Sequence, residues 1–482
     1  MITFILSIVL LLLGYFIYGY YVEKVFGADS ERVTPAHKCN DGIDFLPLQR
    51  GKNLLIQLLN ISGIGPIFGP ILGALYGPVA FIWIVVGAIF AGAVHDYLTG
   101  MISIRNRGAH LPELAGIYLG SVMRHGVNIF SIILLLLVGT VFVSAPSGLI
   151  YSLVPSWLSL SVISGVIFLY YAVATLLPID KIIGRFYPIF GALLLISAAG
   201  IGISLLYSGA PVPELSLDNM HPDGLPIYPL LFLTISCGAL SGFHATQSPI
   251  VSRTTQNESH GRRIFYGMMI GEAIIAMIWA AAAMSLFDNV SLMEIIKHGG
   301  GPAGVVSEIA ERMLGAIGGT LAVIGIIILP ITSGDTAFRS ARMIIADYFN
   351  ICQKKLTSRL WVALPLFIIS FMLTAMDFSL LWRYFSWANQ STAMIALWVG
   401  AVYLYVHNKN YWIAFIPACF ITTTTFTYIL NAQIGFNLPM KASFIAAIVA
   451  TVIVVVLFYR KVIVSSHNTK ILPVEAMPDT DV

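Results

Sequence analysis

Apolar runs about as long as a membrane is thick recur along this chain from its first residues almost to its last. A run of roughly 20 apolar residues crosses the hydrocarbon core of a bilayer as a helix. The chain of 482 residues is 58% hydrophobic and only 10% charged, whereas a soluble domain carries about 25% charged residues. Because this number of charges is too small to cover the surface of a soluble fold, the sequence predicts one all-α membrane bundle.

Thirteen of these runs are long enough to be counted as membrane helices. They lie at 2–22, 54–76, 79–104, 127–150, 160–177, 186–207, 228–250, 264–287, 317–347, 361–377, 379–406, 411–430 and 440–460. The first run lacks a basic flank and exceeds the apolar core of a signal peptide, so we expect it to stay attached.

The basic residues fall almost entirely on one side of this arrangement. Lys and Arg collect in the cytoplasmic loops of membrane proteins. Four of the 26 Lys and Arg residues lie on one side and the other 22 on the opposite side; the four are Lys297, Arg312, Arg383 and Lys441. The count predicts a multi-pass protein of a bacterial inner membrane, with its N-terminus outside and its C-terminus in the cytoplasm.

Several other classes of function lack support in the composition. The net charge is only +3, and no basic run interleaved with aromatic residues suggests nucleic acid. The four cysteines lie far apart, with neither a disulfide pattern nor Cys-x-x-Cys metal spacing. We expect no bound cofactor, and no feature indicates an obligate protein partner.

Two of the predicted helices carry residues that should interrupt them. The second contains NISGIGPIFGP at Asn60–Pro70, and the seventh contains GALSGFHATQSP at Gly238–Pro249. Pro removes a backbone donor and Gly releases conformational restraint, so both helices should unwind there, although such residues also serve as packing sites or kinks. Unwound backbone survives in a bilayer only inside protein or beside a cavity, where it can bind solutes. The substrate-binding candidates in these stretches are Asn60, Gly63, Ile64, Gly65, Pro66, Ser241, Gly242, His244, Thr246, Gln247 and Ser248.

The two breaks are separated by five helices, which predicts an internal duplication. A unit with an odd number of helices inverts when it is duplicated, so helices 2–6 and 7–11 should form two antiparallel repeats. The predicted divisions are 1–53 (N-terminal helix and loop), 54–207 (first repeat), 208–227 (outer loop), 228–406 (second repeat) and 407–482 (two C-terminal helices and tail). Within the second repeat, the outer stretch 288–315 holds two short helical patterns that form either a lid or a passive cap.

The ninth helix carries a polar cluster that suits a cation. Thr332, Ser333, Asp335 and Thr336 offer the oxygen ligands that sodium prefers, and backbone of the second helix is expected to complete the site. An ion pair between Asp335 and Arg339, four residues apart, is the competing interpretation.

Three further polar groups interrupt apolar helices. Asn389 and Gln390 in the eleventh helix either contact substrate or bond to neighbouring helices. His95 and Asp96 end the apolar part of the third helix, and there we expect structural pairing near the cytoplasmic interface. His244 suits a proton relay or a neutral donor to freed backbone.

Several stretches of the chain resemble the CstA (carbon starvation protein) family of peptide and pyruvate transporters. They are NDGIDFLP at Asn40–Pro47, GIGPIFGP at Gly63–Pro70, FAGAVHD at Phe90–Asp96, GFHATQSP at Gly242–Pro249, GDTAFR at Gly334–Arg339 and the pair Asn389–Gln390. The resemblance implies a LeuT-like five-plus-five inverted repeat and uptake of peptides or pyruvate. The family pattern has a His pair before the first broken helix, whereas Ile56 and Gln57 stand here, which puts proton use in question.

These observations together predict a secondary active transporter, not an enzyme. The expected function is cation-coupled symport of a small peptide or a small carboxylate such as pyruvate by alternating access, with sodium or a proton as the coupling ion. Uptake of single amino acids by the same mechanism and a channel-like facilitator are the alternatives. An intramembrane hydrolase has no nucleophile motif to support it. The expected partners are the substrate and the lipid bilayer.

Overall fold

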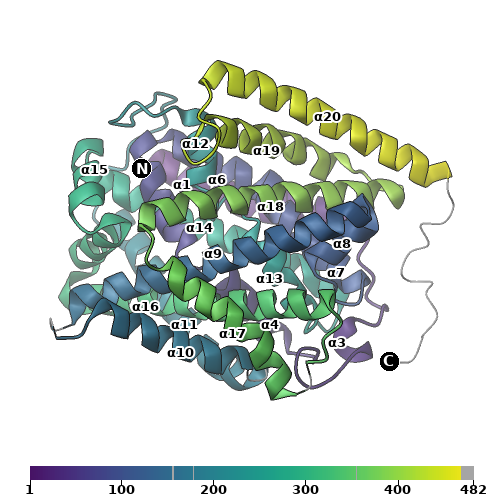
Figure 1. Cartoon of the computed structure of the whole chain (residues 1–482). Coiled ribbons are helices and arrows are strands. Elements are labelled where there is room, and N and C mark those ends of the chain that lie inside the picture. Colours follow the sequence, from purple (N-terminus) through teal and green to yellow (C-terminus); the bar gives the residue numbers. More distant parts are fainter. Residues whose placement is uncertain (155–156, 177–178, 354, 468–482) are drawn as a thin grey trace.

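The chain folds into a bundle of helices. The computed structural model describes residues 1–154, 157–176, 179–353 and 355–467. Within these ranges the only β-type pairing is an isolated bridge between Leu48 and Thr255. Figure 1 shows the long helices running side by side, with α15 at one end of the bundle and α3 at the other. These two ends are called the α15 end and the α3 end below.

The first half of the chain holds α1 to α11. Their bounds are α1 Ile2–Leu13, α2 Gly19–Phe26, α3 Pro35–Lys38, α4 Arg50–Ile61, α5 Gly65–Gly73, α6 Val79–Gly87, α7 Ala93–Arg105, α8 Leu111–Leu119, α9 Ser121–Leu153, α10 Leu160–Leu176 and α11 Ile179–Tyr207. Wider π-helical turns join α1 to α2 and α6 to α7, so each pair forms one continuous rod.

The second half of the chain holds α12 to α20. Their bounds are α12 Ile227–Thr234, α13 Phe243–Ser252, α14 Gly267–Leu286, α15 Asn289–His298, α16 Gly301–Tyr348, α17 Leu356–Leu373, α18 Phe378–Val406, α19 Trp412–Asn431 and α20 Met440–His467. A π-helical turn at Arg262–Tyr266 precedes α14.

The protein is a multi-pass membrane protein. In the described ranges, eight helices are long and apolar enough to cross a membrane, and nine if the bent pair Arg50–Ile61 and Gly65–Tyr76 counts as one span. The helices α12 and α13 are not counted among these spans, because the break between them leaves each piece too short to cross a membrane alone. The count of thirteen membrane helices stays a prediction.

Both predicted helix breaks are present. The axis bends by 46° between α4 and α5, and residues 235–242 separate α12 from α13. Every residue from 56 to 71 and from 235 to 255 is buried. The interrupted backbone therefore lies inside protein, as its exposed amide and carbonyl groups require in a bilayer.

The outermost helices present large apolar side chains outward. Phe16 in the turn between α1 and α2 is 64% exposed, and Trp361 in α17 is 77% exposed. Such surfaces are costly in water and favourable in lipid. They indicate where acyl chains surround the bundle.

The stretch 288–315 is helical, in two pieces. The Asp288 side chain caps α15 by accepting from the backbone N–H groups of Val290 and Ser291. The hydrogen bond from the Ser291 hydroxyl, together with these backbone bonds, lowers the pKa of Asp288. The first part of α16 follows, and Gly315 interrupts it with a φ of 69°. The predicted division between the lid or cap and the membrane helix therefore falls at Gly315. Its backbone conformation is one that only a residue without a side chain adopts easily. Whether these pieces move stays a prediction.

Candidate functional site

The two helix breaks lie against each other. Gly65 begins α5, and a side chain there would occupy the place of the Cys237 side chain from the second break. The Trp83 indole of α6 donates a hydrogen bond of 2.9 Å to the Ile235 carbonyl oxygen. A neighbouring helix thus satisfies one acceptor that the second break releases.

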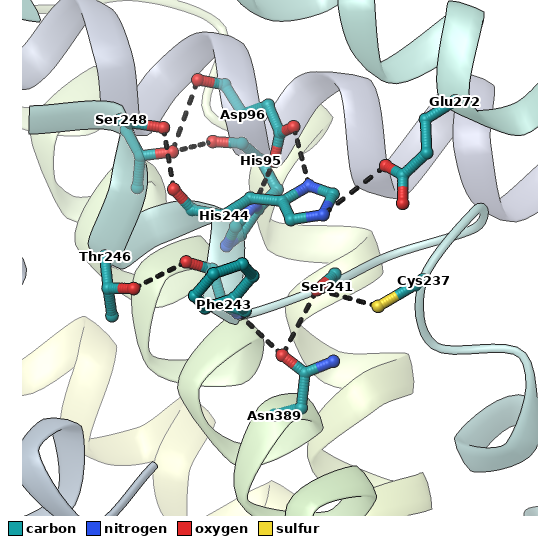
Figure 2. A network of polar contacts seen from close by, with 11 residues as sticks. His95, Asp96, Cys237, Ser241, Phe243, His244, Thr246, Ser248, Glu272 and Asn389 are labelled. Carbon is teal, nitrogen blue, oxygen red and sulfur yellow. Dashed lines mark hydrogen bonds and ion pairs between the residues drawn. The ribbon is translucent and has the colours of Figure 1, made fainter. Parts of the chain in front are cut away.

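Asn389 of α18 holds the second break in shape. Its Oδ1 atom accepts from the Phe243 backbone N–H at 2.6 Å and from the Ser241 hydroxyl at 3.2 Å (Figure 2). Gly242 allows this approach, because a side chain there would collide with the α18 backbone at Asn389. Gln390 similarly donates to the Phe232 carbonyl oxygen of α12 at 2.8 Å. Of the two roles predicted for this pair, the structure shows bonding to neighbouring helices.

A cluster of ionisable side chains joins α7, α13 and α14 beside the second break (Figure 2). Asp96 accepts from His244 Nδ1 at 2.9 Å through Oδ2 and from His95 Nδ1 at 2.8 Å through Oδ1. His244 Nε2 faces a carboxylate oxygen of Glu272 at 3.4 Å. The Cys237 thiol lies nearby and donates to Ser241 at 3.5 Å. Asp96, His244 and Glu272 are fully buried.

Such a cluster cannot keep both carboxylates charged without bound cations. Isolated charges are expensive in the membrane interior, so buried carboxylates are compensated by protons, cationic side chains or metal ions. Here two imidazoles face two carboxylates. The cluster is therefore equipped to hold a proton or another cation.

The sequence indicated only part of this cluster. His244 was a candidate, and the expected pairing of His95 with Asp96 is present. The structure adds a contact that was not expected, because Asp96 also bonds to His244 of the broken helix. Glu272 was missed. Its signal is a single carboxylate in the otherwise apolar helix α14, and an intramembrane charge of that kind is a functional candidate by default.

Two of the other polar residues of α13 bond to backbone, and a third bonds to side chains. The Thr246 hydroxyl donates to the Phe243 carbonyl at 2.6 Å, and the Ser248 hydroxyl donates to the His244 carbonyl at 2.9 Å. Gln247 donates through Nε2 to Ser340 of α16 at 3.4 Å, while its Oε1 atom has no hydrogen-bond partner in the described chain. These side chains mainly stabilise the half-helix.

The first break leaves several polar atoms without partners. Neither amide atom of Gln57 or of Asn60, nor the Ser62 hydroxyl, has a hydrogen-bond partner among the described residues, although all three side chains are buried. A buried polar atom without a partner costs about 1–3 kcal/mol. A solute or water molecule at this break is the natural source of the missing bonds.

The remaining candidates at the first break shape it sterically. A side chain at Gly63 would collide with the ring of Phe142 from α9, and Ile64 is fully buried. Pro66 lies in the first turn of α5, where its missing N–H costs nothing. These residues therefore offer backbone and apolar contact to a ligand.

In α16 the predicted sodium ligands make mainly local contacts. The hydroxyls of Thr332 and Thr336 donate to carbonyl oxygens of their own helix at 2.7 and 3.0 Å. Asp335 lies 3.9 Å from Arg339, so the ion pair weighed as the alternative is present. Ser333 differs from these, because its hydroxyl donates to the Leu59 carbonyl oxygen of α4 at 2.9 Å. The expected neighbourhood of α16 and the first broken helix is therefore present, whereas sodium binding stays a prediction.

A cavity of about 1810 Å³ lies at the α15 end. The exposed residues Lys297 and Arg383 line it, together with the buried rings of Phe68 and Trp382. Phe68 belongs to α5, and the cavity also contacts Thr234 at the end of α12. The cavity thus reaches both broken helices from one end of the bundle.

The α3 end is held together by a buried ion pair. Glu258 is fully buried and accepts from Arg105 at 3.0 and 3.2 Å and from the Asp29 backbone N–H at 2.9 Å. Arg105 also donates to the Tyr403 hydroxyl and to the Gly27 carbonyl oxygen. One network therefore ties together the segment after α2, the end of α7, the turn after α13 and the end of α18.

Sequence comparison relates this chain to membrane transporters. It matches the family described as Carbon starvation protein CstA over residues 1–166, 150–299 and 295–428. An uncharacterized membrane protein of Haemophilus influenzae is 46% identical over 341 residues, which cover 60% of this chain and 92% of that protein. The peptide transporter CstA of Escherichia coli is 24% identical over 91% of this chain and 82% of its own length. The pyruvate/proton symporter BtsT of the same organism is 28% identical over 58% of this chain, but the match covers only 48% of BtsT.

Solved structures with the same fold are transporters of the LeuT type. A manganese transporter mutant of Eremococcus coleocola superposes with a TM-score of 0.56 at 11% identity, over 89% of this chain and 98% of that one. The structure of MhsT with L-phenylalanine gives a TM-score of 0.55 at 13% identity, over 86% and 99%. At such low sequence identities the structural similarity shows the fold alone. Both of these solved proteins are transporters and not enzymes. The extent of the family match shows that this chain belongs to the carbon starvation protein CstA family of membrane transporters.

Proposed function

We propose that the protein is a cation-coupled symporter that takes up a small peptide or a small carboxylate such as pyruvate by alternating access. The observation that carries this proposal is the set of buried polar atoms at the first break, on Gln57, Asn60 and Ser62, that have no hydrogen-bond partner among the described residues. The polar atoms of a transport site lose their hydrogen-bond partners when the solute leaves. A bound solute would supply such partners to these atoms.

The asymmetry of the two ends supports alternating access. The cavity reaches α5 and α12 from the α15 end, while the Glu258–Arg105 pair ties the α3 end together. A carrier open on one side and closed on the other has this form. Since Lys297 and Arg383 belong to the basic-poor side, we assign the α15 end to the outside of a bacterial inner membrane. The thirteen membrane helices, the inverted repeat and the outer N-terminus are part of this proposal.

The relatives are named for the transport of peptides or of pyruvate, and both kinds of substrate carry a carboxylate. The N-terminal ends of α5 and α13 at the two breaks direct partial positive charge toward an anion. Arg383 adds a cation to the cavity. These features favour an anionic group on the solute without distinguishing a dipeptide from a 2-oxo acid.

Two coupling ions have specific support. The contact between Ser333 and the Leu59 carbonyl supports sodium between α16 and α4. The carboxylate oxygens of Asp335, two residues further along α16, accept no hydrogen bond from the described residues and add to this support. The relative named as a pyruvate/proton symporter supports protons. Uptake into proteoliposomes under imposed sodium or proton gradients, applied one at a time, separates the two.

The same assay tests the proposed function. Labelled pyruvate, a dipeptide and a single amino acid are offered in turn, and we expect concentrative uptake of at least one carboxylate-bearing solute under one of the gradients. Flux that never exceeds equilibration would refute symport and favour the facilitator. Concentrative uptake confined to amino acids would refute the proposed substrate class.

The sodium site has its own matched variants. Ser333→Ala and Thr332→Ala should weaken the sodium dependence of uptake. Thr320→Ala is the control, because Thr320 lies exposed in the same helix and donates only to its own backbone. Unchanged sodium dependence in both site variants would exclude α16 as the sodium site.

A further inference from the structure

Three metal-ligating side chains converge beside the second helix break. Single ligand atoms of Cys237, His244 and Glu272 all lie within 4.8 Å of one another, and all three residues are buried. The separation of 3.4 Å between His244 Nε2 and the Glu272 oxygen is close to the spacing of two ligands on one tetrahedral ion with bonds of about 2.0–2.1 Å. In sequence these residues are too widely spaced to form a recognisable metal motif.

The tautomer of His244 is set by its second nitrogen. A carboxylate only accepts hydrogen bonds, so the 2.9 Å contact with Asp96 requires the proton on Nδ1. In the neutral ring, Nε2 then carries the lone pair and points at Glu272. A carboxylate that orients an imidazole in this way is the usual support of a metal-binding histidine. His95 in turn bonds to the other oxygen of Asp96 at 2.8 Å.

Two of the three converging side chains have ligand atoms without hydrogen-bond partners among the described residues. His244 Nε2 and both carboxylate oxygens of Glu272 have no hydrogen bond in the described part of the chain. A lone pair facing a carboxylate oxygen in a buried site is repulsive, so a proton or a metal cation must lie between them. The thiol of Cys237, which arrives at the same point, favours the metal cation.

We propose that Cys237, His244 and Glu272 form a binding site for a divalent transition-metal ion of the zinc class. One sulfur, one nitrogen and one oxygen ligand suit Zn²⁺, whereas Mg²⁺ and Ca²⁺ prefer oxygen alone. A thiolate and a carboxylate carry two negative charges and neutralise the ion, as a buried membrane site requires. Three protein ligands leave the fourth position open to water or to a solute group.

The site lies close in sequence to the lining of the cavity, and a bound ion would affect transport. The cavity at the α15 end contacts Leu233 and Thr234, which lie within four residues of Cys237 in the chain. A bound ion ties the segment 235–242 and α13 to α14. Because the broken helix must rearrange during transport, the ion should hold the carrier in one state and inhibit uptake.

Direct binding to the purified full chain tests the proposal without any transport assay. Titration with CdCl₂ in detergent should give a cadmium–thiolate absorption band that saturates near one ion per chain, and ZnCl₂ should displace it. Cys237→Ser should abolish the band. Cys419→Ser is the matched control, because Cys419 is a half-buried cysteine of α19 outside the cluster, and it should keep the band.

A second variant keeps the test decisive if the cysteine variant folds poorly. Asp96→Asn retains all three ligands but removes the support of His244, and loss of such support typically weakens metal binding by about 10–100-fold. The absence of a band in the wild-type protein, a band that survives Cys237→Ser, or unchanged affinity in Asp96→Asn would each overturn the proposal. Metal-free uptake measured in parallel reports on symport separately, so failure of one conclusion leaves the other standing.

Discussion

Replacing Asn389 by alanine tests how the second helix break is held. The side-chain oxygen of Asn389 accepts from the backbone N–H of Phe243 at 2.6 Å and from the hydroxyl of Ser241 at 3.2 Å, and both donors are buried. An orphaned buried donor costs about 1–3 kcal/mol, and loss of the second hydrogen bond adds about 0.5–1.5 kcal/mol. We expect Asn389→Ala to destabilise the folded protein by roughly 2–4 kcal/mol.

The thermal unfolding midpoint in detergent measures this effect, and uptake kinetics show its consequence. Because Asn389 positions the start of α13, the variant should also raise the KM for substrate more than it lowers the maximal rate. Ser391→Ala is the control, because Ser391 lies two residues further along α18 and donates only to its own helix. If Asn389→Ala unfolds at the same temperature as this control, the break is not held by Asn389.

Three further changes probe the ends and the centre of the bundle. Glu258→Gln breaks a buried ion pair and should cost about 3–5 kcal/mol in detergent unfolding assays. The partly exposed Glu308, changed in the same way, should matter little, and equal effects would exclude a special role for the buried network. Gly65→Ala places a methyl group on the Cys237 thiol of the second break and should abolish uptake. Gly126→Ala is the control, because its methyl group enters open space and should leave uptake intact. An active Gly65→Ala protein would contradict the close contact of the two breaks. Arg383→Gln should raise the KM for a carboxylate by up to about fivefold, the equivalent of roughly 1 kcal/mol for an exposed ion pair, and an unchanged KM would remove Arg383 from substrate attraction.

The helix breaks could be predicted because their causes are local. Gly63, Gly65 and Pro66 change the backbone at the place where they stand, so their effect on a helix needs no knowledge of its neighbours. The structure breaks the helix at 62–64, directly beside these residues. The kink at Gly315 has the same origin and falls at the end of the predicted outer stretch.

The ionisable cluster could not be predicted because its partners are remote. Asp96 and His244 are 148 residues apart in the chain, and nothing in the local pattern of α7 indicates which helix it meets. Single charges in apolar helices mark candidates without naming their partners. Cys237 shows no metal spacing in the sequence for the same reason, since metal motifs there are recognised by close spacing.

Gln57 bears on how this chain departs from the family pattern it resembles. The resemblance places a histidine pair where Ile56 and Gln57 stand, and the structure buries Gln57 with both amide atoms unbonded in the described chain. The amide of Gln57 can donate and accept hydrogen bonds but cannot take up a proton at physiological pH. A histidine can form hydrogen bonds and can also take up a proton. The first break therefore keeps the capacity to bind a polar solute and lacks a titratable group at this position. A proton that drives transport must therefore be carried by another group. For a sodium ion, the contact of Ser333 with the carbonyl of Leu59, two residues after Gln57 in α4, offers a nearby place.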